Sequence, residues 1–104
     1  VRFAPGGTKL ACVSDGDLVV LDASTLQSDG VVVGGLPFIV GLDWFADGQH
    51  LVVTTDAGLE TIGLDGSRSV LVDTFAAIEV DLAPDEKSLV FGTNGSPDLS
   101  IVSL

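Results

Sequence analysis

The sequence predicts an all-β fold of about three four-stranded antiparallel repeats, and three observations carry this prediction. A pattern of apolar strand, turn and apolar strand occurs three times, with its reference residue at Phe3, Trp44 and Leu82. Trp44 follows Phe3 by 41 residues and Leu82 follows Trp44 by 38, a spacing typical of a unit of about four strands. No helical period of any length accompanies the 46% hydrophobic content. Repeats of this kind are β-propeller blades.

The first strand of each repeat is predicted from an apolar, charged, apolar order, which has the period of two of a strand leading into a turn. That order occurs at Val1–Phe3, Leu42–Trp44 and Val80–Leu82. Short apolar runs follow the turns and predict second strands covered on both faces. They lie at Leu10–Val13, Leu51–Thr54 and Leu89–Gly92.

A hairpin and a third strand follow in each repeat. The hairpins are predicted at Asp15-Gly16, Asp56-Ala57 and Asn94-Gly95, because these residue types tolerate the positive φ of tight turns. The third strands are predicted at Leu18–Leu21, Leu59–Ile62 and Leu99–Val102. Fourth strands are predicted only at Val31–Val33 and Ser69–Val72, so the last repeat is incomplete.

These repeats divide the chain into blades at residues 1–36, 37–75 and 76–104, the third without its outer strand. A closed ring needs at least about four blades, so three cannot close. We therefore expect a partial domain that belongs to a larger propeller. The alternative is that two copies join head to tail into a ring of six blades, which cyclic symmetry permits.

The charge of the chain limits its partners. Fifteen acidic residues against four basic ones give a formal net charge of −11. Phosphate would repel such a chain, so neither nucleic acid nor an anionic membrane surface is an expected partner. The sequence also lacks an apolar run long enough for a membrane helix and a cationic leader segment. We expect a soluble piece, and its compartment stays open.

No group of residues in the sequence has the pattern of an active site. The single histidine, His50, lies in the polar position of the repeated turn and is interpreted as a surface residue. Cys12 is alone and aligns with Val53 and Phe91, so it is expected to be a buried thiol. No helix follows Gly6-Gly7 or Gly34-Gly35, which excludes a phosphate cradle of the nucleotide-binding type. The sequence therefore predicts no catalytic, cofactor-binding or metal-binding residues.

A binding rim is the remaining candidate site. The loops between second and third strands and between blades emerge on one face of a propeller, where binding residues are commonly placed. We expect this rim to receive a protein or peptide partner of basic character, or, less favoured, a hard divalent cation. The alternative is that turns alone explain the Asp and Asn residues. The candidate rim residues are Asp15, Asp17, Asp56, Asn94, Asp98, Phe38 and Phe75.

The repeated turn resembles the WD40-like propeller repeats of the TolB and YVTN type. Those repeats place Ser-Pro-Asp-Gly after an apolar or aromatic residue, and the matching segments are Ala4-Pro5-Gly6-Gly7, Ala46-Asp47-Gly48 and Ala83-Pro84-Asp85. The serine is alanine in each copy, and the Trp-Asp and Gly-His signatures of strict WD40 repeats are absent. The resemblance covers the whole chain and implies a bacterial or archaeal propeller protein.

Two functions are consistent with these observations. The favoured one is a propeller segment without chemistry of its own that serves protein–protein interaction or scaffolding. The alternative is a part of a propeller enzyme, either lactonase-like or a peptidase-associated gating propeller, whose catalytic residues lie outside this chain. Convergent His, Glu and Asp residues at the channel of further blades, or an appended hydrolase domain, would distinguish the two.

Overall fold

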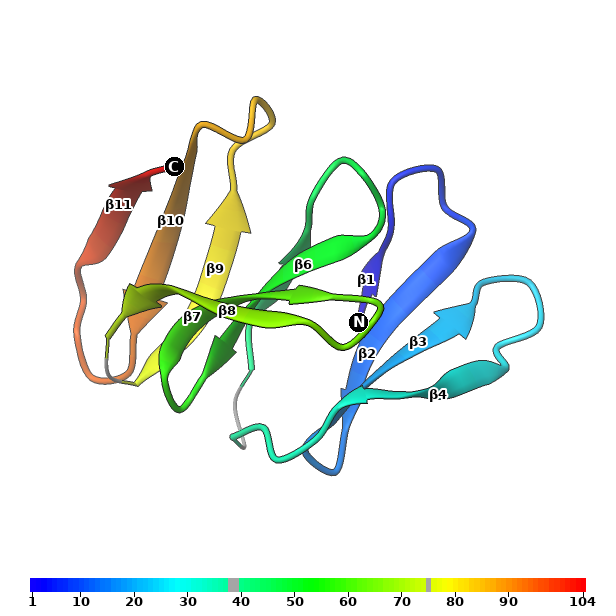
Figure 1. Cartoon of the computed structure of the whole chain (residues 1–104). Coiled ribbons are helices and arrows are strands. Elements are labelled where there is room, and N and C mark those ends of the chain that lie inside the picture. The colour runs from blue at the N-terminus through cyan, green and yellow to red at the C-terminus, as the bar shows by residue number, and fades with distance from the viewer. Residues whose placement is uncertain (38–39, 75) are drawn as a thin grey trace.

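The strands of the chain form three antiparallel sheets that lie face to face in sequence order (Figure 1). The structure is a computed structural model that describes residues 1–37, 40–74 and 76–104. The sheets contain four, four and three strands, which confirms the predicted fold class. We call them blade 1, blade 2 and blade 3. Within the described residues there is no helix long and apolar enough to cross a membrane.

Each blade is a meander in which consecutive strands pair. Blade 1 consists of β1 (Arg2–Phe3), β2 (Lys9–Ser14), β3 (Asp17–Asp22) and β4 (Ser28–Val33). Blade 2 consists of β5 (Leu42–Trp44), β6 (His50–Thr55), β7 (Gly58–Gly63) and β8 (Arg68–Asp73). Blade 3 consists of β9 (Ala77–Leu82), β10 (Ser88–Thr93) and β11 (Leu99–Ser103).

The turn between the first two strands of each blade has the same hydrogen bonds in all three copies. The N–H of residue 7, 48 or 86 donates to the carbonyl of residue 4, 45 or 83, at 2.9, 3.1 and 2.8 Å. Positive φ angles occur at Gly6, Gly7, Gly48 and Glu86 in these turns, where glycine is the least strained residue. The repeat in the sequence is therefore a repeat in backbone geometry.

Two hydrophobic cores fill the spaces between the blades. Between blades 1 and 2, the first core contains Leu18 and Val20 from β3 together with Trp44, Leu51 and Val53. Facing blade 3, the second core joins Val52 and Leu59 of blade 2 to residues of β9 and β10. Strand β6 contributes alternate residues to the two cores, because successive side chains of a strand point to opposite faces. Blade 2 is consequently covered on both faces.

Polar contacts join the inner strands of successive blades. The Trp44 Nε1–H donates to the Arg2 carbonyl oxygen at 3.0 Å, which links β5 to β1. Asp43 Oδ2 accepts a hydrogen bond from the Leu82 N–H at 2.8 Å, which links β5 to β9. The Arg2 guanidinium also lies 3.5 Å from Asp43 Oδ1. Asp43 thus connects blade 2 to both neighbours.

Candidate interaction rim

The hairpins that join second to third strands share one edge of the molecule with the connections between blades. Figure 1 shows the β2–β3, β6–β7 and β10–β11 turns at the lower edge and the repeated first turns at the upper edge. The Leu36 N–H donates to the Gly16 carbonyl at 2.8 Å, and the Asn94 N–H donates to the Ala76 carbonyl at 2.9 Å. In blades 1 and 3, these bonds hold the hairpin between the second and third strands against the neighbouring connection between blades.

In blade 1, the geometry of the turn explains the presence of Asp15, whereas Asp17 packs against the connection to blade 2. Asp15 and Gly16 have φ angles of 51° and 80°, the pair of positive values found in type I′ hairpins. The side chain of Asp15 is exposed, whereas that of Asp17 is half-buried. Asp17 Oδ1 lies 3.0 Å from the position that a Cβ on Gly34 would occupy, so Asp17 rests against the start of the connection to blade 2.

In blade 2, the rim residue Asp56 is exposed between two constrained neighbours. Thr55 Oγ1 accepts a hydrogen bond from the Ala57 N–H at 3.1 Å and donates one to Glu60. Gly58 has a φ of 121°, and a Cβ there would overlap the Val72 carbonyl oxygen. Asp56 itself has no positive φ, so the backbone conformation does not require an aspartate at this position.

In blade 3, Asn94 and Asp98 belong to a longer loop and both are exposed. Ser96 Oγ accepts a hydrogen bond from the Asp98 N–H at 3.2 Å, which orders the end of the loop before β11. Neither Asn94 nor Asp98 has a positive φ. Their side chains point away from the sheet core, as the exposure of both residues shows.

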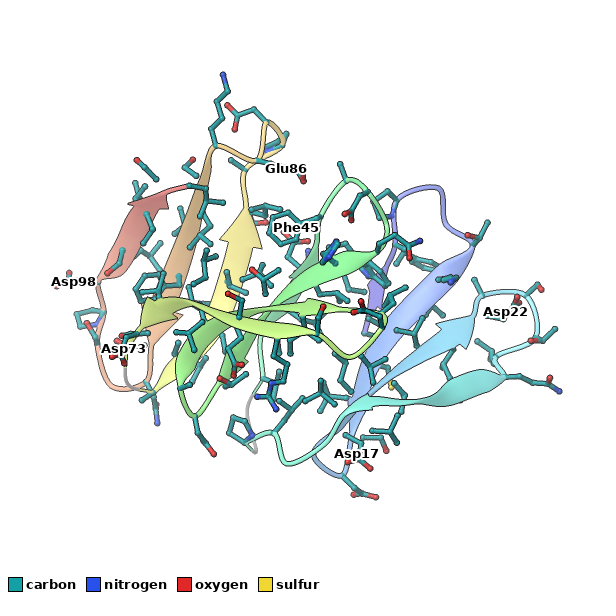
Figure 2. The ribbon with its side chains drawn as sticks, in the orientation of Figure 1. Asp17, Asp22, Phe45, Asp73, Glu86 and Asp98 are labelled. Atoms are coloured by element: carbon teal, nitrogen blue, oxygen red, sulfur yellow. The ribbon has the colours of Figure 1, made fainter. Side chains whose placement is uncertain are left out.

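The rim carries separated carboxylates and does not gather them in one pocket. Figure 2 shows Asp17 at the lower edge of blade 1 and Asp98 well apart from it, at the left end of the molecule on blade 3. Within residues 1–37, 40–74 and 76–104, no group of three or more His, Cys, Asp and Glu side chains is placed to hold a metal ion. The expected aromatic members of the rim, Phe38 and Phe75, lie outside the described residues.

Sequence reasoning missed one further acidic residue at this edge. Asp73, the last residue of β8, pairs with Gly58 of the β6–β7 hairpin and is exposed. Figure 2 shows Asp73 at the left, where β8 ends. Only its place in the repeat could have predicted it, because Asp73 ends a fourth strand directly before a connection between blades.

A partly buried ion pair lies next to the rim in blade 2. Glu60, on β7, is buried and accepts two hydrogen bonds from the half-exposed Arg68, at 3.0 Å from Nε and 2.8 Å from Nη2. The Arg68 hydrogen bonds lower the pKa of the Glu60 carboxyl, against the opposing effect of burial, and the Thr55 hydroxyl lowers it further. Glu60 is therefore held as a carboxylate directly beneath the hairpin that carries Asp56.

His50 lies on the opposite edge, away from the rim. Its Nδ1 is 2.6 Å from Asp47 Oδ2, and Asp47 Oδ1 accepts hydrogen bonds from the Gln49 and His50 N–H groups. The turn hydrogen bond from Gln49, followed by that from His50, lowers the pKa of Asp47. Asp85, the equivalent residue of blade 3, accepts the same kind of bond from the Lys87 N–H at 3.0 Å. The backbone bond to the aspartate is therefore shared by the first turns of blades 2 and 3, whereas the contact with His50 belongs to blade 2, since blade 3 has Ser88 at the equivalent position.

Cys12 corrects one expectation from the sequence. It is only half-buried, whereas the aligned residues Val53 and Phe91 are buried. The reason is that β2 presents Cys12 on the face of blade 1 that is turned away from blade 2, and neither of the two cores formed by the described residues includes it.

Comparison with known proteins shows the fold of the chain. Its structure is similar to that of hydrazine synthase from Kuenenia stuttgartiensis, with a TM-score of 0.74 over 97% of this chain and 17% sequence identity. The chain spans 31% of the length of that solved chain. No protein-family model matches the sequence, and the search of curated proteins found no match. At this level of identity, the likeness concerns the arrangement of the sheets.

Proposed function

We propose that the chain is a non-catalytic segment of a β-propeller that serves protein–protein interaction, and that its rim receives a basic segment of the partner. One observation carries the proposal. The carboxylates of Asp15, Asp56 and Asp98 are exposed on the rim, and none forms an ion pair or accepts a hydrogen bond within the described residues.

Unpaired carboxylates on one edge favour a cationic partner by long-range attraction. Complementary charge mainly raises the association rate and selects against wrong partners, and its effect weakens with salt. The net charge of −11 adds to the attraction. The same charge opposes binding to nucleic acid or to an anionic membrane. A lysine- or arginine-rich peptide is therefore the proposed ligand class.

The rim hypothesis is tested by a triple variant, Asp15→Asn, Asp56→Asn and Asp98→Asn. Asparagine retains the turn preference of aspartate and removes its charge. The probe is a fluorescein-labelled peptide of about ten residues with alternating lysine and serine, and fluorescence anisotropy gives its dissociation constant. With roughly 0.5 kcal/mol for each exposed charge pair, affinity at low salt should fall about tenfold.

The matched control removes three charges away from the rim. Asp22, Asp65 and Asp85 each accept hydrogen bonds from nearby backbone N–H groups in turns outside the rim, and asparagine can still accept those bonds. The control triple variant should retain affinity within about twofold, as expected for distant charges screened by salt. Equal losses in both triple variants would mean that net charge alone attracts the peptide, and an unchanged rim variant would overturn the proposal.

The finer assignment to TolB- and YVTN-type repeats is also part of this proposal. It is supported by the repeated first turn, whose hydrogen bonds recur at equivalent residues of all three blades. The resemblance implies a bacterial or archaeal propeller protein. Fold alone does not define function, so this assignment proposes a class of protein and does not identify a ligand.

A second candidate is a segment of a propeller enzyme with catalytic residues outside these 104 residues. The observation that favours it is that the structurally similar chain is, by name, a synthase of which this chain spans 31%. Mixing this chain with the remainder of its natural gene product, and measuring turnover with and without it, would distinguish the two. A dependence of turnover on these residues would favour the enzyme segment.

A further inference from the structure

The outer faces of blades 1 and 3 have the composition of interfaces between blades. The trailing face is the face of blade 3 that is turned away from blade 2, and it comprises Asp81, Val90, Leu99 and Ile101. The leading face is the face of blade 1 that is turned away from blade 2, and it comprises Phe3, Leu10, Cys12, Val19 and Leu21. Both faces are mostly apolar, and Phe3, Leu99 and Ile101 on them are strongly exposed, although Leu10 is buried.

Comparison with the equivalent residues of the other blades shows that each of the two faces lacks a neighbouring blade. Leu99 occupies the position of Leu18 and Leu59, which are completely buried against the following blade, yet Leu99 is 63% exposed. Ile101 occupies the position of the buried Val20 and is 75% exposed. On the leading face, Phe3 is 62% exposed, whereas the equivalent Trp44 is 6% exposed. The trailing face therefore has the residues that contact a following blade, and the leading face has those that contact a preceding one.

The inner ends of the two faces carry complementary polar groups. Asp43 of blade 2 accepts a hydrogen bond from the Leu82 N–H of the following blade. By repeat equivalence, Asp81 takes the position of Asp43, and Phe3 takes the position of Leu82. A blade 1 docked on the trailing face would present the Phe3 N–H to the exposed Asp81 carboxylate, and Arg2 would lie next to Asp81 as it now lies next to Asp43.

We propose that the trailing face of one copy of the chain binds the leading face of a second copy. The interface continues the packing seen between blades 1 and 2 and between blades 2 and 3. The Arg2–Asp81 pairing favours a second copy over another acidic blade, because Arg2 is one of only four basic residues in the chain. Such an interface is head to tail, so it joins two copies into a ring if the rotation closes.

The test begins with the molar mass of the chain in solution. Sedimentation equilibrium at about 100 µM protein and about 0.5 M NaCl, which screens the repulsion between acidic chains, should give twice the mass of 10.6 kDa or more. Ile101→Asp should raise the dissociation constant about 100-fold or more, because it places a charge in an apolar interface. Val70→Asp is the control, since Val70 is exposed on β8 and belongs to neither face.

A mixing experiment tests the head-to-tail arrangement directly. Ile101→Asp disables the trailing face and Phe3→Asp disables the leading face, so each variant alone should be monomeric. Their mixture keeps one competent face on each partner and should form a 1:1 heterodimer. Both substituted residues are exposed, and circular dichroism of each variant verifies folding.

Two results would overturn the proposal. One is a wild-type chain that stays monomeric under these conditions, which would leave the faces to other occupants such as additional blades. The other is a mixture of the two variants that does not associate although each is folded, because a like-to-like interface would then explain the wild-type dimer. Both results are independent of the rim, whose test uses a peptide and low salt.

Discussion

Gly58 shows how one residue determines how closely two strands approach each other. Its φ is 121°, and an added Cβ would overlap the Val72 carbonyl oxygen and lie 2.7 Å from the Thr74 nitrogen. Gly58→Ala should therefore lower the free energy of unfolding by about 2–4 kcal/mol, from backbone strain plus displacement of β8. Urea denaturation followed by circular dichroism measures the change.

Gly95→Ala is the matched control for this prediction. Gly95 also has a positive φ, of 83°, but nothing lies within 4 Å of an added Cβ. Its substitution should cost only the left-handed backbone penalty, about 1 kcal/mol. Equal losses at both positions would show that the contact with β8 contributes nothing beyond the backbone conformation.

The pair of Glu60 and Arg68 makes stability depend on pH in a defined direction. Because the pKa of Glu60 is lowered from 4.5 in the folded chain, its contribution is present above that pH and is lost as pH falls through the folded pKa. Arg68→Ala should cost about 2 kcal/mol at neutral pH by leaving a buried carboxylate unpaired. The difference from wild type should shrink below pH 4.5.

Urea unfolding of wild type and Arg68→Ala at several pH values measures that difference. Arg68→Lys should fall between the two, since lysine retains the charge and loses the paired hydrogen bonds of the guanidinium. A difference that stays constant down to pH 3, about one unit below the pKa of free glutamate, would contradict the assigned role. The sequence did not predict this pair, because only the register of β7 with β8 brings position 60 near position 68.

Asp43 is the polar link between the inner strands β1, β5 and β9. Asp43→Ala removes the hydrogen bond to the Leu82 N–H, the bond to the Trp44 N–H and the contact with Arg2. It should lower the free energy of unfolding by about 1–3 kcal/mol, because the Leu82 and Trp44 N–H groups lose their acceptor in a partly buried place. Thermal unfolding at low protein concentration measures the loss.

Asp81→Ala is the internal control for Asp43, because the two residues occupy equivalent positions of blades 3 and 2. Asp81 is exposed, and its carboxylate has no partner within the described residues. Its removal should change the stability of the single chain by less than about 0.5 kcal/mol. A large loss at Asp81 would mean that the charge of the inner strands, and not the bonds of Asp43, stabilises the chain.

The sequence pattern predicted which segments form strands, but it was less accurate about the residue at which some strands begin. The repeated first turns were predictable because Pro, Gly and Asp determine their geometry locally. Two strands start three residues earlier than predicted: β4 at Ser28 and β9 at Ala77. In both cases the first extra residue pairs beyond a register shift, as Ser28 does with Leu21 and Ala77 with Thr93. A bulge depends on the partner strand, so a single strand does not show it in its own sequence.

The repeat predicted the order of the blades but not the surroundings of each residue. Cys12 and Val53 are equivalent in sequence, yet Cys12 is half-buried and Val53 is fully buried. The difference comes from the neighbour that each blade has in space. The rim was predictable as an edge, because loops at equivalent places of a repeat must emerge together. The separation of its carboxylates follows from the distance between blades. That distance depends on the packing of many residues, so no single position of the sequence shows it.

The hydrogen bond between the Trp44 indole and the Arg2 carbonyl gives the molecule a built-in optical reporter. Trp44 is the only tryptophan of the chain, and it is buried between the first and second blades. Its fluorescence therefore senses the opening of that interface alone, while far-ultraviolet circular dichroism averages over all three sheets. Coincident melting curves from the two signals would mean that the blades unfold as one cooperative unit. An earlier fluorescence transition would identify the first blade as the part that separates first.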